Sequence, residues 1–142
     1  MTRTARCSCG QLSVTVTGEP SSAGICSCLQ CQRRSGSAFT YNSYWPKTSV
    51  VAITGSHTTW RRRSDSGREI EFHVCPTCYS QVFWYGDFDH GLIGIGVGNF
   101  SDPTFPDPQY AEWGVSKHAW VKVPSACQQS QGELPPEVAI AL

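Results

Sequence analysis

The sequence predicts an all-β fold in which short strands are organised by zinc-bearing turns. Three observations support this prediction. Short segments alternate apolar and polar residues, as strands with one buried face do. Turns rich in glycine, proline, serine and aspartate separate these segments. Close-spaced cysteines gather between the predicted strands, in a pattern typical of metal ligands.

Eight segments carry the strand signal. In the first, Leu12, Val14 and Val16 alternate with polar neighbours. The predicted strands are residues 11–18, 37–45, 49–55, 57–63, 69–74, 80–86, 92–98 and 118–123. Residues 107–114 are expected to form a short helical turn. We expect residues 1–123 to form one zinc-binding β domain. Residues 124–142 lose the periodicity and are expected to form a tail that extends from this domain or packs on it.

Composition narrows the class of protein. A chain of 142 residues with 39% hydrophobic and 15% charged residues is typical of one folded domain. The formal net charge is +0, so nucleic acid is not expected as a partner. Apolar runs are too short for a membrane span, and "MTRTARCSCG" lacks the apolar stretch of a secretory signal. A cytoplasmic location is therefore expected, where thiols stay reduced. A homo-oligomer is compatible with these features.

The eight cysteines are clustered. They fall into two pairs, one triple and a single residue: Cys7 and Cys9, Cys75 and Cys78, Cys26, Cys28 and Cys31, and Cys127. Two separated pairs of thiolates can enclose a zinc ion tetrahedrally, which predicts a closed structural site. The triple leaves one coordination position for water or substrate, as in catalytic zinc sites. The sequence thus predicts two Zn²⁺ ions per chain, with Cys127 unligated.

Two other interpretations of the triple stay open at this point. A histidine could complete it into a second closed site, and the candidates are His57, His73, His90 and His118. Alternatively, Cys28 and Cys31 could form a redox dithiol, although the neighbouring Cys26 favours metal capture.

The motifs together resemble a known family. "CSCGQLSVTVTG", "CSCLQCQRRSGSAF", "CPTC" and "GNFSDP", in this order, resemble the glutathione-dependent formaldehyde-activating enzymes, a family that includes centromere protein V-like domains. The resemblance covers residues 5–123. It implies a β-tent fold of small antiparallel sheets. It also implies a structural zinc held by the first and last cysteine pairs, and a catalytic zinc held by the triple.

This chain departs from the family pattern at three positions beside the ligands. Ser27 stands where the family usually has His, Gln32 where it has Arg, and Tyr79 where it has Gly. Groups next to the ligands tune their orientation and reactivity, so these differences bear on substrate choice more than on metal binding.

The chemistry expected of an open tris-thiolate zinc site is thiol–carbonyl chemistry. Zinc with three thiolates is a weak Lewis acid, better suited to holding a further thiolate than to activating water. The resemblance implies a carbon–sulfur lyase acting on glutathione and formaldehyde, with S-hydroxymethylglutathione as the adduct. Arg33 or Arg34 would offset the negative charge of the site. The competing hypothesis is a non-catalytic zinc module that binds protein or nucleic acid.

Three further features carry weaker signals. The run Arg61–Arg63 could receive substrate carboxylates, but a solvated strand end is favoured. Among residues 83–85, "FWY", one aromatic side chain could line a cleft, but core packing is favoured. Asp87 and Asp89, near His90, could act as acid or base, but the segment is first of all a turn.

Overall fold

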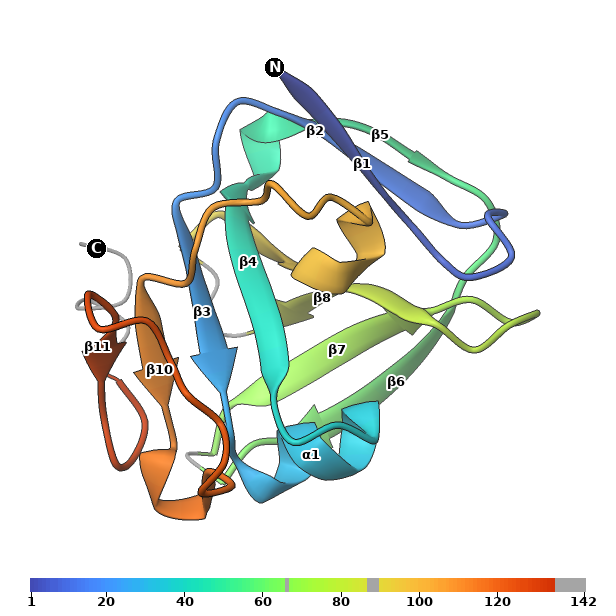
Figure 1. Cartoon of the computed structure of the whole chain (residues 1–142). Helices are drawn as coiled ribbons and strands as arrows, with labels where there is room; N and C mark the ends of the chain where they lie inside the picture. The colour runs from blue at the N-terminus through green and yellow to red at the C-terminus, as the bar shows by residue number, and fades with distance from the viewer. Residues whose placement is uncertain (66, 87–89, 135–142) are drawn as a thin grey trace.

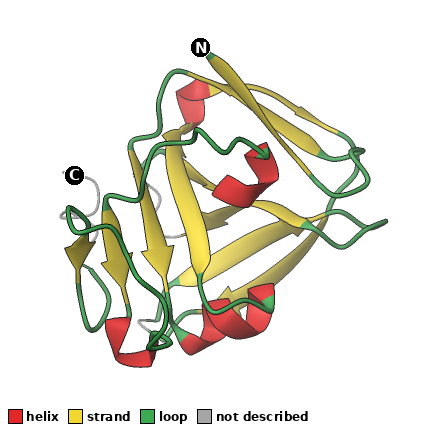
Figure 2. Cartoon of the chain, viewed as in Figure 1, coloured by secondary structure: helices red, strands yellow, loops and turns green. Residues whose placement is uncertain are grey.

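Strands dominate the computed structural model, and the helices are short (Figure 2). The structure describes residues 1–65, 67–86 and 90–134. The strands are β1 (Thr2–Arg6), β2 (Ser13–Thr17), β3 (Ser22–Cys26), β4 (Thr40–Pro46), β5 (Val50–Thr54), β6 (Thr58–Arg63), β7 (Glu69–Val74), β8 (Gln81–Gly86), β9 (Leu92–Gly96), β10 (Tyr110–Glu112) and β11 (Gln128–Gln129). The helical turns are α1 (Leu29–Ser35), η1 (Lys47–Ser49), η2 (Val97–Phe100) and η3 (Gly114–Ser116). The predicted all-β class is confirmed. In the described part of the chain, no helix is long and apolar enough to cross a bilayer.

The strands form two sheets. The smaller has the order β1-β2-β5 and is antiparallel. The larger has the order β11-β10-β3-β4-β9-β8-β7-β6. Its pairings are antiparallel except at β10, which runs parallel to both β3 and β11. Strands β6 to β8 run obliquely behind β3 and β4, so the larger sheet is strongly twisted (Figure 1).

Two predicted elements are wrong. Residues 118–123 form no strand, and residues 107–114 contain strand β10 where a helical turn was expected. Residues 110–112 form a strand because they pair with β3. The Gln109 N–H donates to the Ala23 carbonyl at 2.8 Å and brings the following residues into register with β3. The sequence reasoning also missed β1, β3, β11 and α1.

The described part of the C-terminal tail adds to the larger sheet. Gln128 N–H donates to the Gln109 carbonyl, and Ser130 N–H to the Ala111 carbonyl, both at 2.9 Å. Beyond β11, the Leu134 N–H donates to a carboxylate oxygen of Glu112 at 3.0 Å. This segment therefore reaches the side chains on one face of β10.

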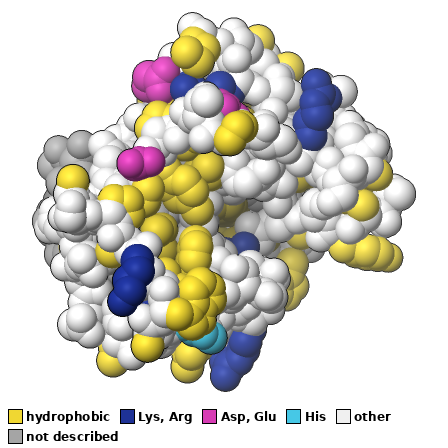
Figure 3. Space-filling view, in the orientation of Figure 1, with side chains coloured by type: hydrophobic (Ala, Val, Ile, Leu, Met, Phe, Trp, Pro, Cys, Tyr) yellow, Lys and Arg dark blue, Asp and Glu magenta, His cyan; other side chains and the backbone are white. Residues whose placement is uncertain are grey.

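The two faces of the larger sheet differ. On β3 and β4, Ala23, Ile25 and Trp45 point into hydrophobic clusters, whereas their neighbours in sequence point to the opposite face. The core is formed mainly by the fully buried side chains of Leu12, Val14, Val16, Trp45, Val82, Phe83, Ile93 and Ile95. A second, smaller cluster of Ile25, Ala111 and Cys127 packs with Phe39, Tyr41 and Val123. Figure 3 shows hydrophobic side chains gathering in a furrow on the face of β3 and β4 turned to the viewer.

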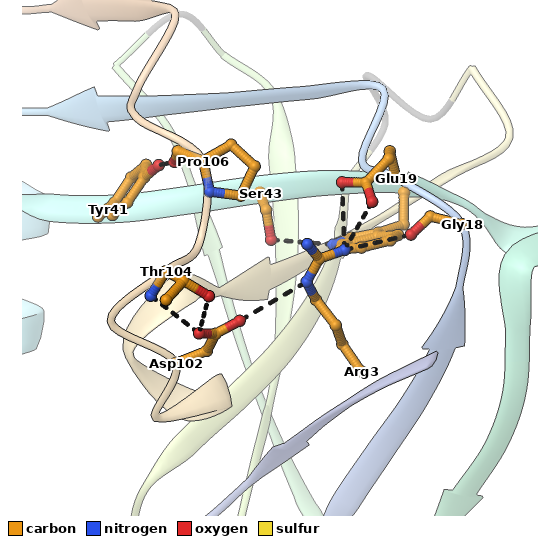
Figure 4. Close-up of polar contacts among 9 residues, drawn as sticks. Arg3, Gly18, Glu19, Tyr41, Ser43, Asp102, Thr104 and Pro106 are labelled. Carbon is orange, nitrogen blue, oxygen red and sulfur yellow. Dashed lines mark hydrogen bonds and ion pairs between the residues drawn. The ribbon is translucent and has the colours of Figure 1, made fainter. Parts of the chain in front are cut away.

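Arg3 connects the small sheet to the rest of the chain (Figure 4). Its guanidinium lies 3.1 Å from both carboxylate oxygens of Glu19 and 3.9 Å from the carboxylate of Asp102. The same guanidinium lies over the ring of Phe105, with its central carbon 5.3 Å from the ring centroid. Asp102 in turn accepts hydrogen bonds from the backbone and hydroxyl of Thr104. These contacts hold β1 against the segment that follows η2.

Candidate metal centre and adjoining pocket

The two cysteine pairs meet at one place. Cys7 and Cys9 lie in the turn after β1, Cys75 and Cys78 lie in the turn after β7, and their four sulfurs lie within 4.8 Å of one another. These two turns lie side by side at one edge of the molecule (Figure 1). Cys7 and Cys9 sulfurs are 3.6 Å apart, and those of Cys9 and Cys75 are 3.7 Å apart. A tetrahedral ion with bonds of about 2.3 Å requires sulfurs roughly 3.8 Å apart. The donor set therefore fits zinc.

Backbone and side-chain N–H groups point at this four-cysteine cluster. The Leu12 N–H lies 3.3 Å from Cys7 sulfur, and the Thr77 and Cys78 N–H groups lie 3.4 and 3.5 Å from Cys75 sulfur. The Gln11 amide nitrogen lies 2.9 Å from the same Cys75 sulfur. Such donors stabilise thiolates, because each supplies partial positive charge to a sulfur that carries negative charge.

The cysteine triple forms a separate group at the end of β3. Cys26 is the last residue of β3, Cys28 caps the N-terminus of α1, and Cys31 lies in the first turn of this helix. Their three sulfurs lie within 4.8 Å of one another. Cys28 sulfur accepts from the Cys31 N–H at 3.3 Å. Hydrogen bonds from the neighbouring thiols of Cys26 and Cys28, together with the nearby charge of Arg34, hold the pKa of the Cys31 thiol well below its ordinary value.

The triple has no fourth protein ligand within the described residues. All four histidines lie in the described part of the chain, and none belongs to either cysteine group. His73 is buried in β7 and lies 2.8 Å from the carboxylate of Glu71, and His118 lies 3.0 Å from the side-chain oxygen of Gln32. The alternative in which a histidine closes the site does not match this geometry. All eight cysteines are described, and none of them is paired in a disulfide.

A cavity of about 160 Å³ adjoins the triple. At about 30 Å³ per water, this pocket has room for roughly five waters, more than a single small carbonyl needs. It is lined by one face of the larger sheet together with α1 and the end of the described tail. Its lining includes Cys26, Cys28, Cys31, Arg34, Arg62, Asp65, Arg68, Phe72, Trp84, Tyr110, Glu112 and Glu133.

Two glycines make room for the aromatic side of this pocket. A Cβ on Gly24 would lie 2.3 Å from the ring of Tyr110, and a Cβ on Gly94 would lie 2.1 Å from the ring of Trp84. Neither distance is sterically possible. The absence of side chains at Gly24 and Gly94 therefore makes room for the two rings beside the backbone of β3 and β9.

The arginines singled out in the sequence have different surroundings in the structure. Arg34 lies at the triple, with one guanidinium nitrogen 3.6 Å from Cys31 sulfur and another 2.6 Å from the side-chain oxygen of Gln81. Arg33 is exposed and points elsewhere. Arg62 is half-buried and lines the pocket, so a solvated strand end is the wrong description of this residue, although Arg61 and Arg63 are exposed.

The other residues with weaker sequence signals also lie in different parts of the structure. Trp84 lines the pocket, whereas Phe83 belongs to the core, so one aromatic residue of this run does face a cleft. Asp87 and Asp89 lie outside the described residues. Cys127 belongs to neither cysteine group and is buried in the smaller hydrophobic cluster.

Glu112 is the pocket residue that sequence reasoning missed. It lies opposite Cys26 in the parallel pairing of β10 with β3. Burial raises the pKa of the Glu112 carboxyl to about 7. Its position depends on a strand of three residues in a parallel pairing, for which the local sequence carries no signal.

Gln32 joins the triple to η3. Its amide nitrogen donates to the carbonyls of Ser27 and Ser116, both at 2.9 Å, and its oxygen faces His118. Ser27 is buried and its carbonyl also accepts from the Ser116 hydroxyl at 2.8 Å. Ser27 and Gln32, which both differ from the usual family residues, therefore belong to one hydrogen-bonded network. This network holds the segment that carries Cys26 and Cys28.

Comparison with known families agrees with this arrangement. The model of the glutathione-dependent formaldehyde-activating enzyme family matches residues 2–122. The chain belongs to this family. The match confirms the resemblance found in the sequence, and it covers both cysteine groups and β10. No curated protein matches the chain. Membership in the glutathione-dependent formaldehyde-activating enzyme family supports glutathione as a thiol substrate, and the two cysteine groups could each hold a metal ion.

Proposed function

We propose that the protein is a zinc-dependent carbon–sulfur lyase that makes or breaks adducts between glutathione, or a related thiol, and a small aldehyde. The observation that carries this proposal is a group of three sulfurs, without a fourth ligand among the described residues, beside a cavity of about 160 Å³. Family membership supplies the substrate class. A cytoplasmic location suits eight unpaired thiols.

The two metal sites have different roles in this proposal. Cys7, Cys9, Cys75 and Cys78 hold a structural zinc, and Cys26, Cys28 and Cys31 hold a catalytic zinc. A zinc ion at the triple would bind the substrate sulfur and keep it deprotonated, which makes it nucleophilic. The enzyme thus uses two zinc ions per chain.

The reaction balances without an oxidant or reductant. In the forward direction a carbon–sulfur bond forms between the thiol sulfur and the carbonyl carbon, the C=O double bond becomes a single bond, and the thiol proton ends on the oxygen. The reverse reaction releases the aldehyde and the thiol. The chain must therefore hold the sulfur, offset negative charge and move one proton.

Pocket residues supply these roles. Arg34 places positive charge 3.6 Å from Cys31 sulfur, which offsets the charge of the thiolates. Glu112 lines the same pocket and is the residue to which we assign the proton, since a carboxyl with a pKa of about 7 both gives and takes a proton near neutral pH. The apolar rings of Phe72 and Trp84 restrict water around the sulfur.

Metal analysis and cobalt substitution test the proposal. We expect two zinc ions per chain, and we expect glutathione to change the visible spectrum of the cobalt-loaded triple. We also expect the enzyme to accelerate decay of S-hydroxymethylglutathione, with Glu112→Gln slowing turnover while leaving the cobalt response to glutathione in place. An unchanged spectrum at saturating glutathione would contradict the proposal, as would the absence of a metal ion at the triple.

A further inference from the structure

The arginines of β6 point to opposite faces of the sheet and meet different surroundings. Arg61 lies on one face, 2.6 Å from the carboxylate of Glu71 and 3.8 Å from that of Glu69. Arg62 lies on the other face and lines the pocket. Within the described residues it has no carboxylate partner, and its one hydrogen bond is a 3.5 Å contact to the Arg63 carbonyl. Its Nε is buried and has no acceptor.

Arg34 has a similar lack of acidic partners. Its hydrogen bonds reach the neutral side chain of Gln81 and the sulfur of Cys31, and its Nε is also buried without an acceptor. The guanidinium carbons of Arg34 and Arg62 lie 4.6 and 5.9 Å from the centroid of the same ring, Phe72. Two guanidinium groups without carboxylate partners thus share one aromatic residue on the pocket face.

Three carboxylates of the described residues line the pocket; Asp65 is exposed, and the other two are engaged elsewhere. Glu133 is paired with Arg68, and Glu112 accepts the backbone N–H of Leu134. Removing a guanidinium from water without an anionic partner is costly, so a half-buried arginine of this kind favours binding of an anion. A guanidinium also presents two parallel N–H donors that match the two oxygens of a carboxylate.

We propose that Arg62, with Arg34, forms a carboxylate-binding subsite that selects thiols carrying a carboxylate at a distance from the sulfur. The inference rests on the proposed function, because it requires the substrate sulfur to lie at the cysteine triple. Arg34 links the two positions, since it contacts both Cys31 and the Phe72 ring. Arg62 is then a specificity-determining residue, which excludes neutral thiols and their aldehyde adducts.

The test compares ligands with and without carboxylates on the full-length, metal-loaded protein. Calorimetric titration would measure glutathione and glutathione diethyl ester, in which both carboxylates are blocked, against the wild type, Arg62→Gln and Arg61→Gln. We expect the wild type to prefer glutathione about tenfold or more, the size of one charged hydrogen-bonded pair. Arg62→Gln should lose this preference, whereas Arg61→Gln should keep it. Equal preference in wild type and Arg62→Gln would overturn the subsite.

Two further measurements separate this inference from the proposed function. S-methylglutathione has both carboxylates but no free thiol, so its binding should weaken in Arg62→Gln even if no metal is bound at the triple. If glutathione changes the cobalt spectrum but neither ligand depends on Arg62, the subsite fails and the proposed function stands. If S-methylglutathione binding depends on Arg62 while the cobalt spectrum never responds, the proposed function fails. Arg62→Lys, which keeps the charge but not the paired donors, should recover only part of the affinity.

Discussion

Tyr79 occupies a backbone conformation that favours glycine. It follows Cys78 with φ of 62°, in the left-handed region, and its side chain is 77% exposed. A Cβ in this region costs roughly 1–2 kcal/mol, and an exposed ring offers little packing in return. Replacing Tyr79 by Gly should therefore stabilise the protein by about 1 kcal/mol in urea unfolding, after the greater freedom of glycine in the unfolded chain is allowed for. Tyr79→Ala is the control, since it removes the ring but keeps the Cβ, and an equal gain in both variants would contradict the backbone explanation.

Asp102 makes stability depend on pH. The hydroxyl and backbone N–H of Thr104 donate to its carboxylate, Arg3 lies nearby, and together they lower its pKa below the ordinary value. A carboxyl with a lowered folded pKa stabilises the protein above the unfolded value of about 3.9, and this contribution disappears as pH falls through the folded pKa. Asp102→Asn should therefore be slightly less stable than wild type at neutral pH and equal to it in strong acid. Denaturant midpoints of both proteins, measured from neutral pH to strong acid, test this prediction. A stability difference that does not change with pH would refute it.

At the scale of elements, sequence patterns locate strands and ligands better than they locate surfaces. The cysteine groups were predictable because short spacings fix thiols within one turn and zinc requires about four of them. Alternation also placed β7 at residues 69–74. Alternation could not show that Arg62 faces a pocket. It indicates which residues share a face of a strand, but not which other elements pack against that face. Strand β3 was missed because all five of its residues are buried, so the alternation that marks a half-exposed strand is absent.

The packing of Trp84 beside β9 depends on Gly94. A methyl group there would meet the ring of Trp84, which is only 4% exposed and has little room to move. Gly94→Ala should therefore cost about 1–3 kcal/mol in unfolding free energy, the usual range for overpacking, and should weaken ligand binding in the pocket because Trp84 lines it. Gly98→Ala is the matched control, since nothing lies within 4 Å of its added methyl group. Equal stability of the two variants would show that Trp84 adapts without cost.

At the scale of the whole molecule, the two cysteine groups differ in what they connect. The four-cysteine cluster joins the β1–β2 turn of the small sheet to the β7–β8 turn of the larger sheet, across more than sixty residues of chain. Arg3 supplies a second connection, between β1 of the small sheet and the segment that follows η2. The triple lies within one continuous segment, from the end of β3 into α1. Loss of a metal at the first group should therefore separate sheets, whereas loss at the second should disturb only one loop.

Matched cysteine replacements test this division. Cys75 is fully buried, and its sulfur receives several N–H groups, so Cys75→Ser should lower the unfolding free energy by at least about 3 kcal/mol, within the range of losses when a structural metal ligand is removed. Cys31→Ser should lower it by less than about 1 kcal/mol while removing one metal ion per chain and all turnover. Metal content by mass spectrometry and urea unfolding measure both effects. A strong chelator should then destabilise wild type and Cys31→Ser alike, because both retain the metal that joins the sheets. If Cys31→Ser unfolds as readily as Cys75→Ser, the triple holds the fold together and is not an open site.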